Sequence, residues 1–228
     1  MITIKNLFAV SIILLGMSSA VQAQRFQAGA DFSTAVPLGT FKDNVINNGY
    51  GVSGNFLIRI GSLPLLAGID LGTVRYGSTS RREPLGPTIP EVTVKVQTNN
   101  NIFLNHFLLR LQPREGRVRP YADGLIGLKY LSTSTSVSDT RGGEAIASTK
   151  NFSDTAFSYG YGGGLQVRLA RTARSEILFD SKIHYLRGGR AEYLREGSIR
   201  QVDGGLVFDV FSSRTDIIGL QFGVTFHF

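Results

Sequence analysis

The chain has no cysteine and no tryptophan, and only three of its 228 residues are histidine. Without cysteine it has no disulfide framework, no thiolate metal site and no cysteine nucleophile. The histidines, at positions 106, 184 and 227, belong to three separate segments, so we expect structural roles for them and neither a metal ion nor another cofactor. After the first residues, no segment has the roughly 20 apolar residues of a membrane-spanning helix. A helical membrane protein is therefore excluded.

The first 23 residues have the pattern of a secretory signal peptide. Lys5 gives a positive start, an apolar run extends from Leu7 to Met17, and small residues stand at Val21 and Ala23. The apolar run is too short for a membrane anchor. We therefore predict an exported protein with a signal peptide at residues 1–23, cleaved near Ala23, and a single mature domain at residues 24–228.

Eight segments of the mature chain alternate apolar and polar residues with the period of two that is typical of β-strands. They lie at about residues 25–36, 50–60, 65–76, 92–111, 121–132, 157–169, 176–185 and 217–228. The connections between them alternate between long (40–48, 77–90, 133–154 and 187–214) and short (61–64, 112–120 and 170–174). An even-numbered up-and-down barrel has all its long loops at one end. The predicted fold class is all-β, an eight-stranded antiparallel up-and-down transmembrane β-barrel, and residues 206–211 are expected to extend its wall.

Alternation fits both a soluble barrel with an apolar interior and a membrane barrel with an apolar exterior. Glycines crowded on a polar face, tyrosines near strand ends and an aromatic last residue favour the membrane barrel over a soluble periplasmic carrier. Eight strands leave an interior that side chains fill. We therefore predict a lumen closed by a polar network of Asp31, Arg59, Asp70, Lys129, Arg168, Glu176, Asp180, Lys182 and His184.

The chain ends on an aromatic residue after alternating hydrophobic residues, in the sequence Gln221-Phe222-Gly223-Val224-Thr225-Phe226-His227-Phe228. This ending resembles the closing-strand signal of outer-membrane proteins. The resemblance implies that the barrel-assembly machinery is a partner and reads Phe222, Gly223, Val224, Phe226 and Phe228.

The mature chain also resembles the small outer-membrane β-barrel domain family, which includes PorT-like and OmpA-OmpX-type eight-stranded barrels. The resembling segments are Ala35–Phe41, Leu109–Pro113 and Pro120–Gly124. The resemblance implies the fold and a location in the cell outer membrane of a bacterium with two membranes. The family shares no catalytic residues, so no activity follows from it.

The expected function is a structural or surface-interaction role through the long extracellular loops, without enzymatic activity. Basic residues in those loops, such as Arg81, Arg82 and Lys150, point to outer-membrane lipid and lipopolysaccharide as partners. Nucleic acid is not an expected partner of an exported barrel. Arginines of the short turns, Arg119 among them, are expected to contact headgroups of the inner leaflet.

Two alternative functions stay open. A lipid-modifying enzyme would use His184 as a base, Asp180 to orient it and an inward serine, Ser158 or Ser53, as a nucleophile. An accessory of a secretion system, with a secretion-system partner, is what the PorT-like resemblance allows.

Overall fold

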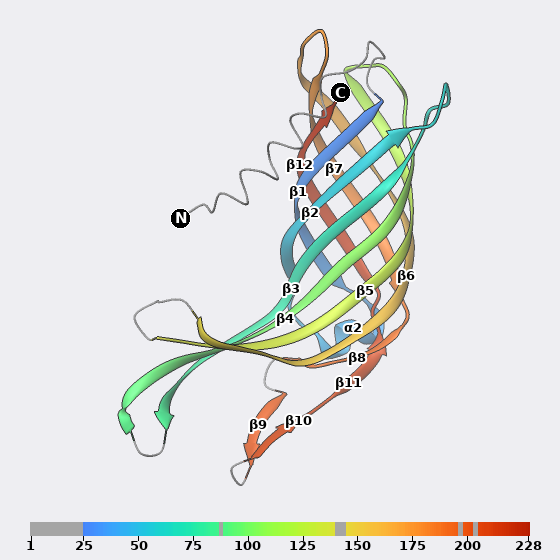
Figure 1. Cartoon of the computed structure of the whole chain (residues 1–228). Helices are drawn as coiled ribbons and strands as arrows, with labels where there is room; N and C mark the ends of the chain where they lie inside the picture. The colour runs from blue at the N-terminus through green and yellow to red at the C-terminus, as the bar shows by residue number, and fades with distance from the viewer. Residues whose placement is uncertain (1–24, 87–88, 140–144, 196–197, 203–204) are drawn as a thin grey trace.

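The computed structural model describes residues 25–86, 89–139, 145–195, 198–202 and 205–228. The predicted signal peptide at residues 1–23 lies outside these ranges. Eight antiparallel strands close into a barrel in the order β1-β12-β7-β6-β5-β4-β3-β2 (Figure 1). The first and last strands pair from Gln27 opposite His227 to Pro37 opposite Ile217, so the barrel wall has no open edge. The predicted eight-stranded up-and-down barrel is confirmed.

Four of the barrel strands are short and four are long. β1 (Phe26–Pro37), β2 (Gly49–Arg59), β7 (Glu176–Gly188) and β12 (Ile217–His227) have 11 to 13 residues. Their length is close to the roughly 9–11 residues of a tilted strand that crosses a bilayer. β3 (Leu65–Gly86), β4 (Ile89–Leu111), β5 (Val118–Asp139) and β6 (Ala145–Arg171) have 22 to 27. The long strands must therefore extend beyond the barrel.

The four long strands continue past one rim as a single antiparallel sheet, at the lower left of Figure 1. β2 pairs with β3 only as far as Arg75, whereas β3 stays paired with β4 to Gly86. At about 3.3 Å per residue this extension reaches roughly 35 Å. We call residues 77–86, 89–101, 132–139 and 145–153 the protruding sheet. The loops expected at 77–90 and 133–154 are thus wrong over most of their length, because backbone pairing extends the strands where hydrophobic alternation has stopped.

The other two long connections also contain regular structure. The first, expected as a loop over 40–48, holds the short helix α2 (Gly39–Asn44). The last holds β8 (Arg190–Tyr193), β9 (Ile199–Val202), β10 (Gly205–Phe208) and β11 (Phe211–Arg214). The expected wall extension at 206–211 is wrong, because β10 pairs with β9 and β11 with β8 within this connection. No helix in the described ranges is long and apolar enough to cross a membrane.

Side chains along the barrel strands point as the period of two predicts. On β12, Phe222 and Phe226 are exposed on the outer wall, whereas Gln221 and Thr225 are buried inside. The same holds around the barrel, where the exposed apolar side chains include Phe32, Phe56, Ile69, Phe107, Ile126, Phe157 and Phe179. A soluble protein rarely exposes so continuous an apolar surface. With its polar side inside, the barrel is not the soluble apolar-cored carrier that alternation alone allowed.

Glycines on the inner face let neighbouring strands curve tightly. Gly164 lies on the inner face of β6, and a Cβ atom there would collide with the backbone carbonyl of Ser181 and with the ring of Tyr121. An outward glycine, Gly124 on β5, has no atom within 4 Å of the same position. The inward glycines thus make room for the large polar side chains that fill the lumen.

Candidate functional site

The centre of the lumen holds a bidentate ion pair between β4 and β5. Arg110 donates from Nε to Oδ1 of Asp123 and from Nη2 to Oδ2, both at 2.8 Å, and both side chains are fully buried. The guanidinium also lies 3.7 Å from the centroid of the Tyr121 ring. His184 on β7 places Nε2 3.0 Å from Oδ2 of the same carboxylate. Buried charges are stable only when paired in this way.

A second cluster lies beside the first and links β1, β5, β7 and β12. Lys182 donates from Nζ to Oδ2 of Asp31 at 2.6 Å. Tyr121 donates its hydroxyl to Oδ1 of Asp180 at 2.5 Å, and Thr225 donates to Oδ2 at 3.1 Å. The structure therefore brings together four predicted lumen residues, namely Asp31, Asp180, Lys182 and His184.

The third cluster lies at the end with the short turns, around Glu176. Arg119 forms an ion pair with Glu176 from the inner face of β5, and Arg168 donates to the other carboxylate oxygen at 3.0 Å. Nδ1 of His227 lies 3.0 Å from Nη1 of Arg119. Arg119 is therefore buried in the lumen, and its expected contact with headgroups is wrong because β5 already begins at Val118.

Three predicted lumen residues have a different environment. Lys129 is fully buried and donates to the backbone carbonyls of Leu186 and Thr215, at 3.0 and 2.6 Å, rather than to a carboxylate. Asp70 is buried with Oδ1 unbonded. Arg59, the last residue of β2, is half-buried and forms no ion pair with the described residues. These three lie on the inner face without joining the ion pairs.

Sequence reasoning missed Arg110 and Tyr121, the two residues that connect the central clusters. The alternation on β4 is weak, since the inner face also carries Ile102, Leu104 and Leu108. Arg110 nevertheless lies four residues after the inward-facing His106, so counting by two along β4 would have placed Arg110 inside the barrel. No such count identifies its partner, which depends on the register of β4 against β5.

The hydrolytic arrangement of His184, Asp180 and a serine is not present. His184 contacts Asp123, and Ser158 instead lies 3.0 Å from Nε2 of His106 while donating to the carbonyl of Arg187 at 3.1 Å. Ser53 is buried with its hydroxyl unbonded. All three histidines of the chain are at most 3% exposed, so none can contact a lipid substrate. Within the described ranges, no cluster of acidic and histidine side chains has the geometry to hold a metal ion.

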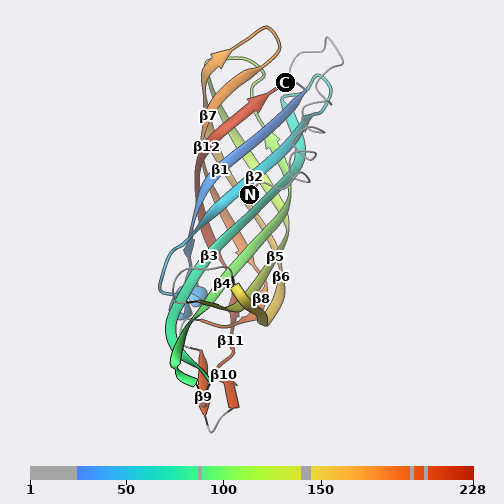
Figure 2. The ribbon, with the colours of Figure 1, turned by 60° about the vertical axis from the view of Figure 1, so that its left-hand side comes forward.

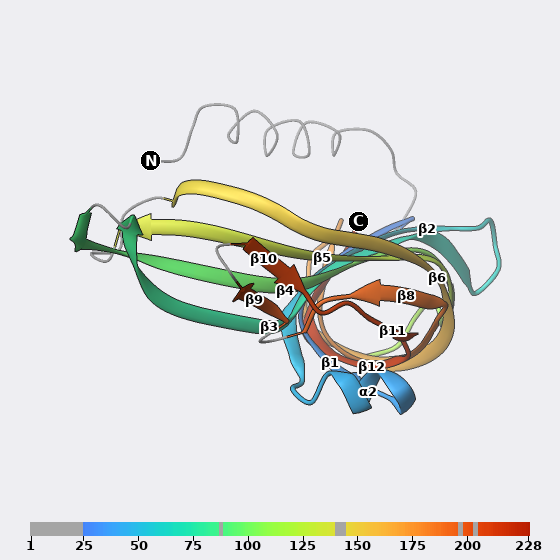
Figure 3. The ribbon, with the colours of Figure 1, turned by 90° about the horizontal axis from the view of Figure 1, so that it is seen from below.

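An aromatic cap closes the lumen at the end with the long connections. Phe41 of α2 is fully buried, with its ring centroid 5.1 Å from that of Tyr193 on β8 and 6.0 Å from that of Tyr76 on β3. Tyr76 donates its hydroxyl to the carbonyl of Leu194 at 3.0 Å. Seen from this end, β8 and β11 cross the barrel opening and α2 lies at its rim (Figure 3). The lumen is thus closed by polar side chains along its length and by the cap at one mouth.

The protruding sheet has two outer strands, β3 and β6, and the edge of β3 is open. Beyond Arg75, β3 has β4 on one side and no other strand of the described chain on the opposite side. The opposite border, β6, pairs with β7 only from Ser158 onward, and at the rim the backbone N–H of Gly189 donates to the carbonyl of Phe157 at 2.7 Å. In the side view of Figure 2, the cap and the β9–β10 hairpin lie at the same end as this sheet, opposite the carboxyl terminus.

Comparisons with known proteins find similar folds and no relatives by sequence. No family model matches the chain, and no curated protein matches it. Among solved structures, Neisserial surface protein A is 12% identical, with a TM-score of 0.44 over 91% of this chain and 98% of that one. The attachment invasion locus protein Ail of Yersinia pestis is 13% identical, with a TM-score of 0.40 over 91% and 100%. A major outer membrane protein of Thermus thermophilus is 10% identical, with a TM-score of 0.39 over 89% and 99%. Likenesses this weak carry no inference about what this chain does.

Proposed function

We propose that this protein is an integral outer-membrane barrel that holds the protruding sheet outside the cell, where its open edge contacts another protein. The observation that carries the proposal is the unequal length of the strands. Four strands end at the rim, and four continue for roughly 35 Å as a sheet. A barrel whose only role was to span the membrane would need no such extension.

The outer surface of the barrel supports its place in a membrane. Exposed phenylalanine, leucine and isoleucine side chains cover the wall, while ion pairs and hydrogen bonds fill the interior. Lipid solvates an apolar exterior, and a closed barrel satisfies every backbone group of its wall. The short turns and both described chain ends, at Arg25 and Phe228, then face the periplasm, and the protruding sheet faces the outside.

The open edge of β3 supports a role in protein contact. Beyond Arg75 no strand of the described chain pairs with the outer side of β3, and an extended segment of another chain can add to such an edge by strand pairing. The exposed side chains of this edge strand include those of Ser78, Ser80 and Arg82, which are polar or charged. Polar and basic side chains reduce aggregation of an edge while leaving its backbone accessible.

Surface labelling of introduced cysteines tests which end of the barrel faces outside the cell. The chain has no cysteine of its own that could also react. Cysteine is introduced by Ser80→Cys on the protruding sheet or by Ala173→Cys on a short turn, both at exposed positions. A bulky, membrane-impermeant maleimide should label the first variant in intact cells and the second only after the outer membrane is opened. Labelling in the reverse order would refute the orientation, and release of the protein from membranes by salt alone would refute the barrel as an integral one.

Photo-crosslinking tests the edge itself. A photoreactive amino acid is placed at Ser80 on the edge strand or, as a control, at Thr98, which lies between Thr79 and Thr135 inside the sheet. Intact cells are irradiated alone and after incubation with soluble extracellular proteins. Adducts formed only by the Ser80 variant after incubation support surface interaction, whereas adducts with an envelope protein in cells alone favour a secretion accessory. Equal adducts from Thr98, or none from either, contradict the edge proposal and favour a purely structural role.

A further inference from the structure

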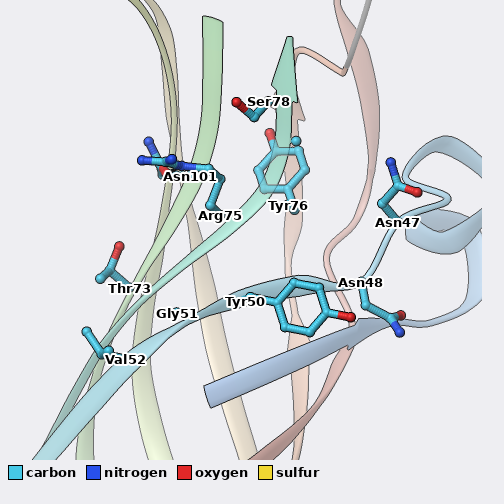
Figure 4. A pocket seen from close by; sticks show the side chains of 11 residues that line it. Asn47, Asn48, Tyr50, Gly51, Val52, Thr73, Arg75, Tyr76, Ser78 and Asn101 are labelled. Carbon is cyan, nitrogen blue, oxygen red and sulfur yellow. Dashed lines mark hydrogen bonds between the residues drawn. The ribbon is translucent and has the colours of Figure 1, made fainter. Parts of the chain in front are cut away.

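A cavity of about 510 Å³ opens on the outer wall of the barrel, at the base of the protruding sheet. β2, β3, β4 and the connection after α2 form it, and its lining includes Asn48, Tyr50, Val52, Arg75, Ser78 and Asn101. Figure 4 shows Tyr50 in the middle, with the asparagines of the connection on one side and Arg75 and Asn101 on the other. The cavity lies apart from the ion pairs of the lumen, and it borders the open edge of β3 at Ser78.

The cavity lies where the apolar wall ends. Along the paired strands, Val52 is opposite Thr73, and Thr73 is opposite Phe103. One step further toward the protruding sheet, Tyr50 is opposite Arg75, and Arg75 is opposite Asn101. Apolar side chains thus line its lower part, and polar ones with a single positive charge line its upper part. In the proposed membrane orientation, this boundary is at the headgroups of the outer leaflet.

The polar part suits an anionic, hydroxyl-rich headgroup. Arg75 is exposed on the outer face, and Nε donates to Oδ1 of Asn101 at 3.3 Å, which orients its guanidinium. None of the lining residues, all within the described ranges, is acidic. A guanidinium binds phosphate through paired charge-assisted hydrogen bonds. Asparagine amides both donate and accept, as sugar hydroxyls require, and the exposed Tyr50 ring offers an apolar face for a sugar ring.

From this geometry we infer that the cavity is a binding site for a phosphorylated glycolipid of the outer leaflet, with the phosphate on Arg75 and the sugar among the asparagines and Tyr50. The site rests on the proposed function, since only an outer-membrane barrel in the stated orientation presents the cavity to that leaflet. Acyl chains of the lipid would continue down the wall along Val52 and its neighbours. An ordinary anionic phospholipid would occupy the arginine without using the amides.

The test compares the mature protein with two matched variants in nanodiscs. Arg75→Gln removes the charge in the cavity, and Arg82→Gln removes the same charge from an exposed position seven residues further along the same strand. Each protein is placed in phosphatidylcholine discs that contain a phosphorylated diglucosamine lipid, the same lipid without phosphates, or phosphatidylglycerol. Native mass spectrometry then measures the lipid that stays bound.

The wild type and Arg82→Gln should retain the phosphorylated glycolipid about tenfold more than either other lipid, and Arg75→Gln should lose that preference. An unchanged preference in Arg75→Gln, or an equal loss in Arg82→Gln, overturns the site. Equal retention of phosphatidylglycerol by the wild type overturns the sugar part of the assignment. Failure of the wild type to insert, seen as absence of a heat-modifiable gel shift, would instead refute the proposed function.

Discussion

Arg110 and Asp123 face each other across two adjacent strands and form two parallel hydrogen bonds of 2.8 Å, with both side chains fully buried in the lumen. Removing Arg110 leaves the buried Asp123 carboxylate with His184 as its remaining partner, and breaking a buried ion pair in this way costs about 3–5 kcal/mol. We expect Arg110→Ala to lower the free energy of unfolding by that amount, measured by urea titration of the barrel in detergent micelles.

Arg171→Ala is the control for this ion pair. Nε of Arg171 lies 3.4 Å from Oε1 of Glu176, but the Arg171 side chain is mostly exposed. Its removal should therefore lower the free energy of unfolding by less than about 1 kcal/mol. Equal losses in the two variants would mean that the lumen is hydrated and that its ion pairs are screened as surface pairs are.

Gly164 is expected to tolerate no side chain. In Gly164→Val, the new methyl groups would collide with the Ser181 carbonyl and the Tyr121 ring and displace the hydroxyl that Tyr121 donates to Asp180. The variant should give little or no heat-modifiable barrel. Gly124→Val adds the same atoms on the outer wall, where nothing lies within 4 Å, and should assemble normally. Normal assembly of both would show that the wall can relax around position 164.

The terminal aromatic residue can be tested apart from the backbone pairing that it takes part in. The backbone N–H of Phe228 donates to the carbonyl of Phe26 at 3.0 Å, and the two rings stack with centroids 5.9 Å apart. Phe228→Ala keeps the backbone pairing but removes the aromatic ring of the predicted assembly signal. We expect several-fold less barrel in the outer membrane, measured by fractionation and gel shift. Phe26→Ala removes the same ring contact and should have a smaller effect. If the two variants lose barrel assembly to the same extent, ring stacking rather than a terminal signal explains the aromatic ending.

Phe41 is expected to hold the cap in place. Truncating a fully buried phenylalanine costs about 3–5 kcal/mol, and here the loss falls on the contacts with Tyr76 and Tyr193. Phe41→Ala should therefore let trypsin cleave after Arg190 and Arg195 faster than in the wild type, while the barrel keeps its gel shift. Ile46→Ala changes an 85% exposed side chain of the same connection and should leave cleavage unchanged. An unaltered cleavage rate in Phe41→Ala would mean that the cap is held by other contacts.

The sequence alone was sufficient for the number of barrel strands and, on the strands with clear alternation, for the side of the wall that their residues face. On β12 and β7 the alternation is nearly unbroken, and the outward Phe222 and Phe179 and the inward Gln221 and Asp180 lie as predicted. The physical reason is that a strand between lipid and a polar lumen has two different environments, so each position is constrained by one of them. The same reasoning placed the buried charges on the inner face.

Only the tertiary structure decided where the long strands end and which charges meet. Ser78 and Ser134 lie in stretches with polar side chains on both faces, so no hydrophobic period marks them. Their backbone pairing with β4, which the sequence predicts as a strand from residue 92, extends the sheet. The contact of His184 with Asp123, rather than with Asp180 of its own strand, depends on the register of three strands. Gly162 of β6 is opposite Asp123 of β5 on one side and opposite His184 of β7 on the other. Side-chain alternation is a property of one strand, whereas ion pairs, the aromatic cap and the outer-wall cavity each require several strands to meet in space.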